Sequence, residues 1–281
     1  MQIYTLHTLD RLCLPGSPHH PCEDLVDTGA ARLLLLDGAS PLVPSIMAPS
    51  DAVWFVREVA RMVSTLPPIR GESLPQFLMD CMRCIHWNID QDAPSAGIAL
   101  VRLEEDHLDY LLLGDCSLSI ERTDGTSLPI ENDALHRLDS MALDELQTHA
   151  ARLGASPRAC LPLIQDTLRR NRALRNTPGG YYILDPSGAG IPHAVTGSLP
   201  APEVRSVFLC SDGFAQLCSF TGSSLTALHR RAKGSGLEAL YGSLCALQDS
   251  DPCFERLPRF KHRDDVSAVL AEIKTTTKGG R

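Results

Sequence analysis

The sequence predicts an α+β fold with mostly antiparallel sheets, on three observations. Short apolar or alternating runs recur near the start, in the middle and near the end of the chain, and amphipathic stretches lie between them. Four short acidic motifs stand at the ends of apolar runs in both halves of the chain. If these motifs share one site, residues 1–273 form a single domain. We expect residues 274–281, which follow the last apolar run, to be a disordered tail.

Six segments have the length and composition of strands. Each is short, apolar or alternating, and bounded by Gly, Asp, Asn or Pro. They are residues 32–36, 97–103, 108–113, 117–121, 206–210 and 266–273. Only a few residues separate the third segment from the fourth, so we expect a meander around Gly114-Asp115.

Helices are predicted between these strands. In residues 51–66 apolar side chains recur at helical spacing, Ser50 suits the N-terminus, and Pro67-Pro68 ends the run. Residues 73–88 show the same spacing, with Ser73 as the cap. Further helices are expected at 141–153, at 157–175 with a proline in the first position, and at 237–247.

Composition excludes several classes of protein. The 281-residue chain has no run of about 18 apolar residues, which excludes a membrane span, and its start lacks the pattern of a secretory signal. The net charge of -8 argues against broad binding to nucleic acid. We therefore expect a cytoplasmic location, with the ten cysteines as free thiols. The pair Cys81 and Cys84 lacks a second ligand pair and lies inside a predicted helix, so we interpret it as structural.

The acidic motifs indicate a metal site. Asp37-Gly38 and Ser211-Asp212-Gly213 follow apolar runs, Gly114-Asp115-Cys116-Ser117 follows another, and Asp264-Asp265 precedes the last. Aspartates that converge from strand ends repel one another unless a hard cation neutralises them. The motifs therefore predict a multi-aspartate site for Mg²⁺ or Mn²⁺, ions that prefer oxygen ligands.

Together with Glu23-Asp24, these motifs resemble in order those of the metal-dependent protein phosphatases of type 2C, over residues 20–272. The segment 176–182 resembles a divergent bacterial branch of that family. The resemblance implies a sandwich of two antiparallel β-sheets flanked by α-helices, with two or three metal ions at one edge. The metal ligands that it implies are Glu23, Asp24, Asp37, the Gly38 carbonyl, Asp115, Asp212 and Asp264. Asp265 stands where the family often has Asn, so either Asp264 or Asp265 is the ligand.

The resemblance also implies a reaction. A hydroxide bridging two metal ions would attack the phosphorus of a phosphoserine or phosphothreonine, with no covalent intermediate on the protein. Asp37 would be the bridging ligand. Many members carry an Arg that grips the substrate phosphate, and His19 stands in its place. Candidates for that role are His19, His20, Lys261 and Arg263, and either histidine or a metal-bound water could protonate the leaving group.

Two functions remain open at this point. The first is a Mg²⁺- or Mn²⁺-dependent serine/threonine phosphoprotein phosphatase in signalling, with a phosphorylated protein as substrate and a separate kinase or regulatory partner. The second is a catalytically weak or inactive phosphatase-like binding module, which the missing Arg and the altered Asp37-Gly38-Ala39 loop favour. A metal phosphatase acting on a small phosphorylated molecule is a third possibility.

Overall fold

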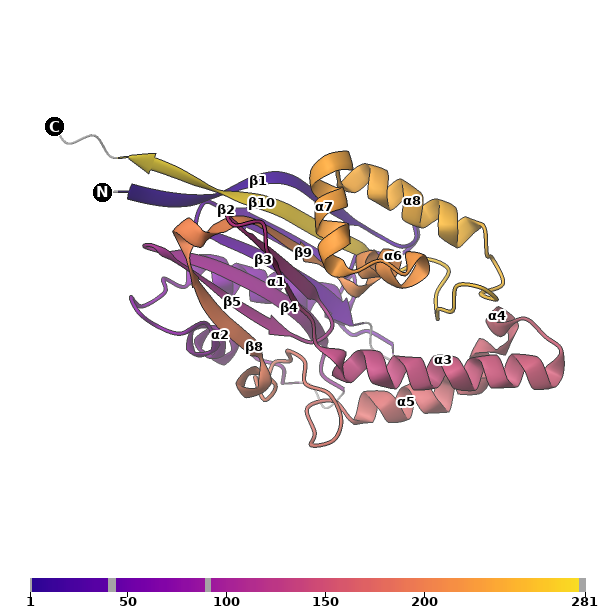
Figure 1. Ribbon diagram of the computed structural model, residues 1–281. Coiled ribbons are helices and arrows are strands. Elements are labelled where there is room, and N and C mark those ends of the chain that lie inside the picture. The colour runs from indigo at the N-terminus through magenta and orange to yellow at the C-terminus, as the bar shows by residue number, and fades with distance from the viewer. Residues whose placement is uncertain (1, 40–43, 89–91, 278–281) are drawn as a thin grey trace.

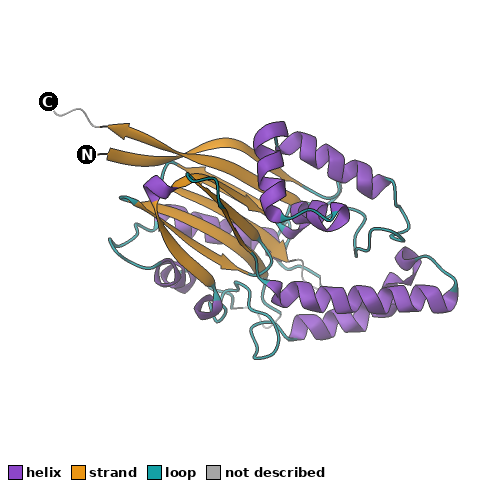
Figure 2. Cartoon of the chain, viewed as in Figure 1, coloured by secondary structure: helices purple, strands orange, loops and turns teal. Residues whose placement is uncertain are grey.

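Two five-stranded antiparallel sheets pack face to face in the computed structural model, which describes residues 2–39, 44–88 and 92–277 (Figures 1 and 2). The first sheet has the strand order β1 (Gln2–Leu14), β10 (Val266–Thr277), β9 (Val204–Cys210), β6 (Ser117–Arg122) and β7 (Ser127–Ile130). The second has the order β2 (Leu25–Gly29), β3 (Arg32–Ala39), β4 (Ser95–Glu104), β5 (His107–Leu113) and β8 (Val195–Pro200). The predicted α+β sandwich is confirmed.

Helices cover the outer face of each sheet. Against the second sheet lie α1 (Asp51–Thr65) and α2 (Leu74–Arg83), and against the first lie α6 (Asp212–Thr221), α7 (Leu225–Ser235) and α8 (Leu237–Asp249). Strand β3 is therefore buried on both faces: Leu33 and Leu35 pack between the sheets, and Leu34 and Leu36 pack against α1 and α2. Side chains alternate along a strand, so a four-leucine run fits only a strand covered on both sides.

A helical hairpin extends beyond the sandwich (Figure 1). It comprises α3 (Asp133–Leu153), α4 (Pro157–Cys160), η1 (Leu161–Ile164) and α5 (Gln165–Ala173), which share a small apolar core. Two further 3₁₀ turns, η2 (Ile191–His193) and η3 (Ala201–Glu203), flank β8. The hairpin begins near the edge of the sandwich where β5 ends.

Several expectations about the elements were wrong. The meander around Gly114-Asp115 is absent from the described residues, because β5 pairs with β4 and β8 whereas β6 pairs with β7 and β9. The chain instead crosses from one sheet to the other here, and Gly114 has a φ of +87°, a conformation that favours glycine. The helix expected at 141–153 begins at Asp133. The helix expected at 157–175 is broken at Leu161–Ile164, where Pro162 lacks a backbone N–H.

The expected tail also differs. Strand β10 continues to Thr277, which pairs with Gln2 of β1, so residues 274–277 are a strand and were wrongly predicted to be disordered. The neighbouring strand supplies backbone hydrogen bonds, and threonine is a residue that suits strands. Residues 278–281 lie outside the described part of the chain. Among the described residues, no helix is long and apolar enough to cross a membrane.

Candidate metal centre

The two sheets meet at one edge through a pair of aspartates. Asp37 lies near the end of β3, in the second sheet, and Asp212 is the first residue of α6, directly after β9 of the first sheet. The backbone amide of Asp212 donates a hydrogen bond to Oδ2 of Asp37, at 3.2 Å. A helix N-terminus favours a carboxylate. This contact brings together residues 175 positions apart in the chain.

Glu23 and Asp24 lie against the same strand end. A Cβ atom on Gly38 would stand 2.3 Å from the Glu23 carbonyl oxygen, so only glycine allows this approach. The hydroxyl of Ser50, which also caps α1, donates to Oε1 of Glu23 at 2.6 Å. Asp24 is buried, and its Oδ2 has no hydrogen-bond partner within the described chain.

The two adjacent aspartates before β10 have different surroundings. The Asp265 carboxylate accepts hydrogen bonds from the backbone amides of Gly16 at 2.8 Å and Glu23 at 2.6 Å. Asp265 therefore fastens the loop that carries Glu23. Asp264 Oδ1 instead accepts a hydrogen bond from Lys261 Nζ at 2.6 Å. A Cβ atom on Gly213 would stand 3.3 Å from the Cβ of Asp264, so Asp264 lies beside the start of α6. This geometry favours Asp264 over Asp265 as the residue that faces the centre.

Asp115 enters the centre from the crossing between the sheets. A Cβ atom on Gly97 of β4 would stand 2.7 Å from Asp115 Oδ1 and 3.5 Å from the Cβ of Asp37. Gly97 thus makes the space in which the Asp115 carboxylate lies. The sequence motif correctly placed this aspartate at a strand end, although the structure places it between sheets.

Burial and the charges of neighbouring carboxylates raise the pKa of Asp37 and of Asp212. For Asp37 the largest cause is the loss of hydration on burial, followed by the charges of Asp24, Asp212, Asp115 and Asp264, and its pKa lies well above the usual range. Burial, then Asp115 and Asp264, raise the pKa of Asp212 to about 7. Like charges brought together disfavour the ionised form of each, whereas a bound cation favours it.

Asp139 belongs to this group and was missed by sequence analysis. It lies on α3, and burial, with the charge of Asp212 next, raises its pKa to about 7, while Arg172 of α5 opposes the shift. For Asp115, burial is the largest cause and Asp139 the next, and together they raise its pKa to about 6. No apolar strand precedes Asp139, so the strand-end rule that found the other aspartates could not find it.

The carboxylate oxygens of this centre are suitable ligands for a hard divalent cation, but the side chains are not grouped as they would be around a bound ion. Within the described ranges, no group of three or more His, Cys, Asp or Glu side chains is arranged to hold a metal ion. The carboxylates are nevertheless oxygen donors that repel one another, and buried Asp24 carries an unpartnered Oδ2. Residues of the correct type to hold a divalent cation are therefore present.

The four basic candidates have separate environments. His19 is exposed, and His20 and Lys261 line a cavity of about 860 Å³ that also includes Glu23 and Asp264. Arg263 lines this cavity too, but its Nη2 donates to both carboxylate oxygens of Asp249 at 2.7 Å. Lys261 is thus the basic residue in direct contact with a candidate metal ligand.

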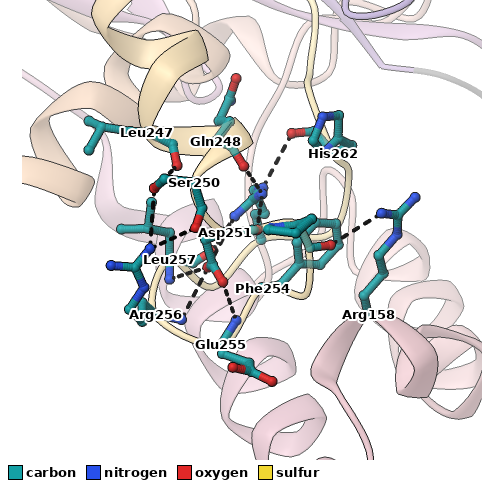
Figure 3. A network of polar contacts seen from close by, with 12 residues as sticks. Arg158, Leu247, Gln248, Ser250, Asp251, Phe254, Glu255, Arg256, Leu257 and His262 are labelled. Atoms are coloured by element: carbon teal, nitrogen blue, oxygen red, sulfur yellow. Dashed lines mark hydrogen bonds and ion pairs between the residues drawn. The ribbon is translucent and has the colours of Figure 1, made fainter.

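A buried network fixes the loop that leads to Lys261 and Asp264. Asp251 accepts hydrogen bonds from the backbone amides of residues 255, 256 and 257, as Figure 3 shows. The guanidinium of Arg259 donates to the carbonyls of Gln248 at 2.9 Å, Asp251 at 2.6 Å, Leu257 at 2.8 Å and His262 at 3.3 Å. It also lies 4.2 Å above the ring of Phe254. The loop is therefore held by the chain itself, independently of any ion.

Known structures share this architecture. No protein-family model matches the chain, and no curated protein sequence matches it. The serine/threonine phosphatase PstP/Ppp of Mycobacterium tuberculosis superposes with a TM-score of 0.52 at 16% identity, covering 96% of this chain and 98% of that one. The regulatory component PppA of Pseudomonas aeruginosa gives 0.52 at 14% identity, with 98% and 100% covered, and a bacterial serine phosphatase gives 0.51 at 13%, with 95% and 98% covered. The expected type 2C phosphatase fold is thereby confirmed.

Proposed function

We propose that this chain, which has the fold of the type 2C phosphatases, is a Mg²⁺- or Mn²⁺-dependent phosphatase acting on phosphoserine or phosphothreonine in proteins. The observation that carries the proposal is the convergence of Asp37, Asp115, Asp212 and Asp264 from both sheets, where the charges of Asp115 and Asp264 raise the pKa of both Asp37 and Asp212. Such a group destabilises the fold unless cations are bound, and divalent ions with phosphate chemistry offer a reason for its presence. We further propose that residues 1–273 belong to one domain, which continues through residue 277 because β10 pairs with β1 as far as Thr277.

The carboxylates have distinct proposed roles. Asp37 would bridge two ions, with Glu23, Asp24 and the Gly38 carbonyl on one side. Asp212 and Asp264 would lie on the other, and Asp115 would hold a third ion with Asp139 beside it. Two bound divalent ions supply positive charge for the phosphate oxygens and lower the pKa of a water. The protein's contribution is to hold these side chains at one edge through the Gly38, Gly97 and Gly213 approaches.

The phosphate would be bound by Lys261 in place of the missing Arg. Lys261 Nζ lies at the centre's edge, 2.6 Å from Asp264, and lines the 860 Å³ cavity together with His20. A cavity of this volume suits a phosphorylated side chain with its flanking residues. His20 lines this cavity and His19 does not, so we place the leaving-group proton on His20 first and His19 second.

A binding module is the second candidate. It is favoured by the exposed His19 at the usual Arg position and by the finding that no three His, Cys, Asp or Glu side chains of the described residues are grouped to hold a metal ion. In that case the cavity would bind a phosphorylated segment without hydrolysing the phosphate ester. A cytoplasmic location and a separate kinase or regulatory partner belong to either proposal.

The test is hydrolysis of a phosphothreonine peptide and of p-nitrophenyl phosphate with Mn²⁺, with Mg²⁺ and with chelator. Wild type should turn over only with metal, and Asp37→Asn should abolish turnover. Asp106→Asn is the matched control, because this exposed aspartate lies in the β4–β5 turn, at the opposite end of β5 from Asp115. Metal binding without turnover would favour the binding module. Turnover confined to small phosphate esters would favour a small-molecule substrate.

A further inference from the structure

Two thiols touch beside the candidate metal centre. The Sγ atoms of Cys13 and Cys22 lie 3.7 Å apart. Cys13 is exposed near the end of β1, and Cys22 is half-buried in the loop that leads to β2. The other motif pair, Cys81 and Cys84, differs because Cys81 is fully buried in α2. Proximity and exposure together make Cys13 and Cys22 a candidate for oxidation.

The same thiols adjoin two proposed metal ligands. Cys22 precedes Glu23 and Asp24 directly, and Cys13 Sγ donates a hydrogen bond to the Asp24 carbonyl oxygen at 3.5 Å. The Glu23 amide is in turn bound by Asp265 at 2.6 Å. Movement of either sulfur atom would therefore shift the backbone of Glu23 and Asp24.

We propose that Cys13 and Cys22 form a reversible disulfide on exposure to peroxide, and that this modification weakens metal binding by displacing Glu23 and Asp24. The first half concerns the thiols alone. The second half rests on the proposed metal-dependent function.

The chemistry balances with a peroxide as the oxidant. The exposed Cys13 thiolate attacks one peroxide oxygen, the O–O bond breaks, and a sulfenic acid forms while the other oxygen leaves as water or alcohol. The Cys22 sulfur then attacks the Cys13 sulfur, the S–O bond breaks, and the hydroxide leaves as water with the Cys22 proton. Two thiols are oxidised by two electrons, and the peroxide is reduced by two.

Bond formation would move the loop more than the strand. A disulfide requires an S–S distance of about 2.0 Å, so the sulfurs must approach from their present 3.7 Å. Cys13 lies in a ladder with β10, where it pairs with Ser267, whereas Cys22 lies in an irregular segment. Most of the shift therefore falls on Cys22 and its neighbour Glu23, whose contact with Gly38 leaves no spare room.

The first measurement detects the bond itself. Reduced full-length protein is treated with hydrogen peroxide, remaining thiols are alkylated, and the protein is digested with trypsin. The peptide spanning residues 12–32 contains both thiols and no other cysteine. We expect this peptide to be unalkylated and lighter by two hydrogen atoms, and to recover both labels after dithiothreitol. A peptide that stays fully alkylated, or that carries only sulfinic acid, would overturn the proposal.

The second measurement is Mn²⁺ affinity by calorimetry before and after oxidation. Displacing the support of a metal ligand typically costs about tenfold or more in affinity, and we expect a loss of that size. Cys22→Ser should be insensitive to peroxide, and Cys84→Ser, an exposed thiol elsewhere, should respond like wild type. A disulfide with unchanged Mn²⁺ affinity would overturn the second half. Reduced protein that binds no Mn²⁺ would instead refute the proposed function, while the disulfide would still support the first half.

Discussion

Replacing Arg259 with Met tests whether the loop before Asp264 is held by one guanidinium. Arg259 and Asp251 are 3% and 4% exposed in their side chains, and their charged atoms lie 3.5 Å apart. Arg259 also donates to four backbone carbonyls. Methionine matches the arginine side chain only as far as Nε, so it donates no hydrogen bond and also loses the contact of Cζ with the Phe254 ring.

The expected cost follows from these contacts. Removing one partner of a buried ion pair typically costs about 3–5 kcal/mol of unfolding free energy. Asp251 keeps three backbone amide donors, so its charge is not left uncompensated, and we expect the lower end, about 3 kcal/mol. For a chain of this size that corresponds to a fall in melting temperature of roughly 6–12 °C.

The assay is thermal and urea unfolding of wild type and Arg259→Met in chelator, which removes any stabilisation by bound metal. Arg256→Met is the control, because Arg256 donates to Ser250 from an exposed position in the same loop. The control should cost less than about 1 kcal/mol. A loss below about 1 kcal/mol in Arg259→Met as well would refute the reasoning.

Two further predictions concern the centre, and a third concerns His229, a buried histidine of α7. Asp37→Asn should raise the melting temperature in chelator, because it removes one of several like charges that lie close together. Calorimetry should find that the variant no longer binds Mn²⁺. An unchanged melting temperature and an unchanged Mn²⁺ affinity would show that Asp37 is not a metal ligand at this centre. Lys261→Ala should raise KM for a phosphopeptide about tenfold. The control Arg263→Ala should change KM less than about twofold, because the Arg263 guanidinium is paired with Asp249. Equal effects of the two substitutions would show that Lys261 does not bind the phosphate. Burial lowers the pKa of His229 from 6.5 to about 4, so the unfolded state takes up a proton first as pH falls from about 6.5 to 4. Wild type should therefore lose up to about 3 kcal/mol relative to His229→Gln over that window, and parallel stability curves would contradict this.

Much of the sandwich could be predicted from local pattern. The four-leucine run, the caps at Ser50 and Ser73 and the strand at 206–210 are encoded in neighbouring residues. Strand β1 was missed because only one of its thirteen residues is fully buried, and five of them are exposed. The pairing of the strands on either side of Gly114 could not be predicted from local sequence, because antiparallel strands joined by a short connection usually pair with each other. Here β6 pairs instead with β9, which lies far away in the sequence.

The site was predictable to the extent that its residues follow strands. Asp212-Gly213 has the pattern of a turn, yet it begins α6, and Gly213 is required because a Cβ there would stand 2.0 Å from the Asp265 carbonyl oxygen. That close approach joins residues from two distant segments, so no local rule predicts it. Asp139 lies beyond local rules for the same reason, since its relation to Asp115 depends on how the helical hairpin meets the sandwich.

The carboxylates of the centre and the loop that supports them have opposite effects on the free energy of unfolding. The charges of four neighbouring aspartates raise the pKa of Asp37, and such repulsion destabilises the fold when no ion is bound. The Asp251–Arg259 network stabilises the segment that carries one of these neighbours, Asp264. The network thus holds Asp264 close to its neighbours against their repulsion. It follows that Arg259→Met should weaken Mn²⁺ binding as well as folding, although Arg259 contacts none of the candidate metal ligands among the described residues.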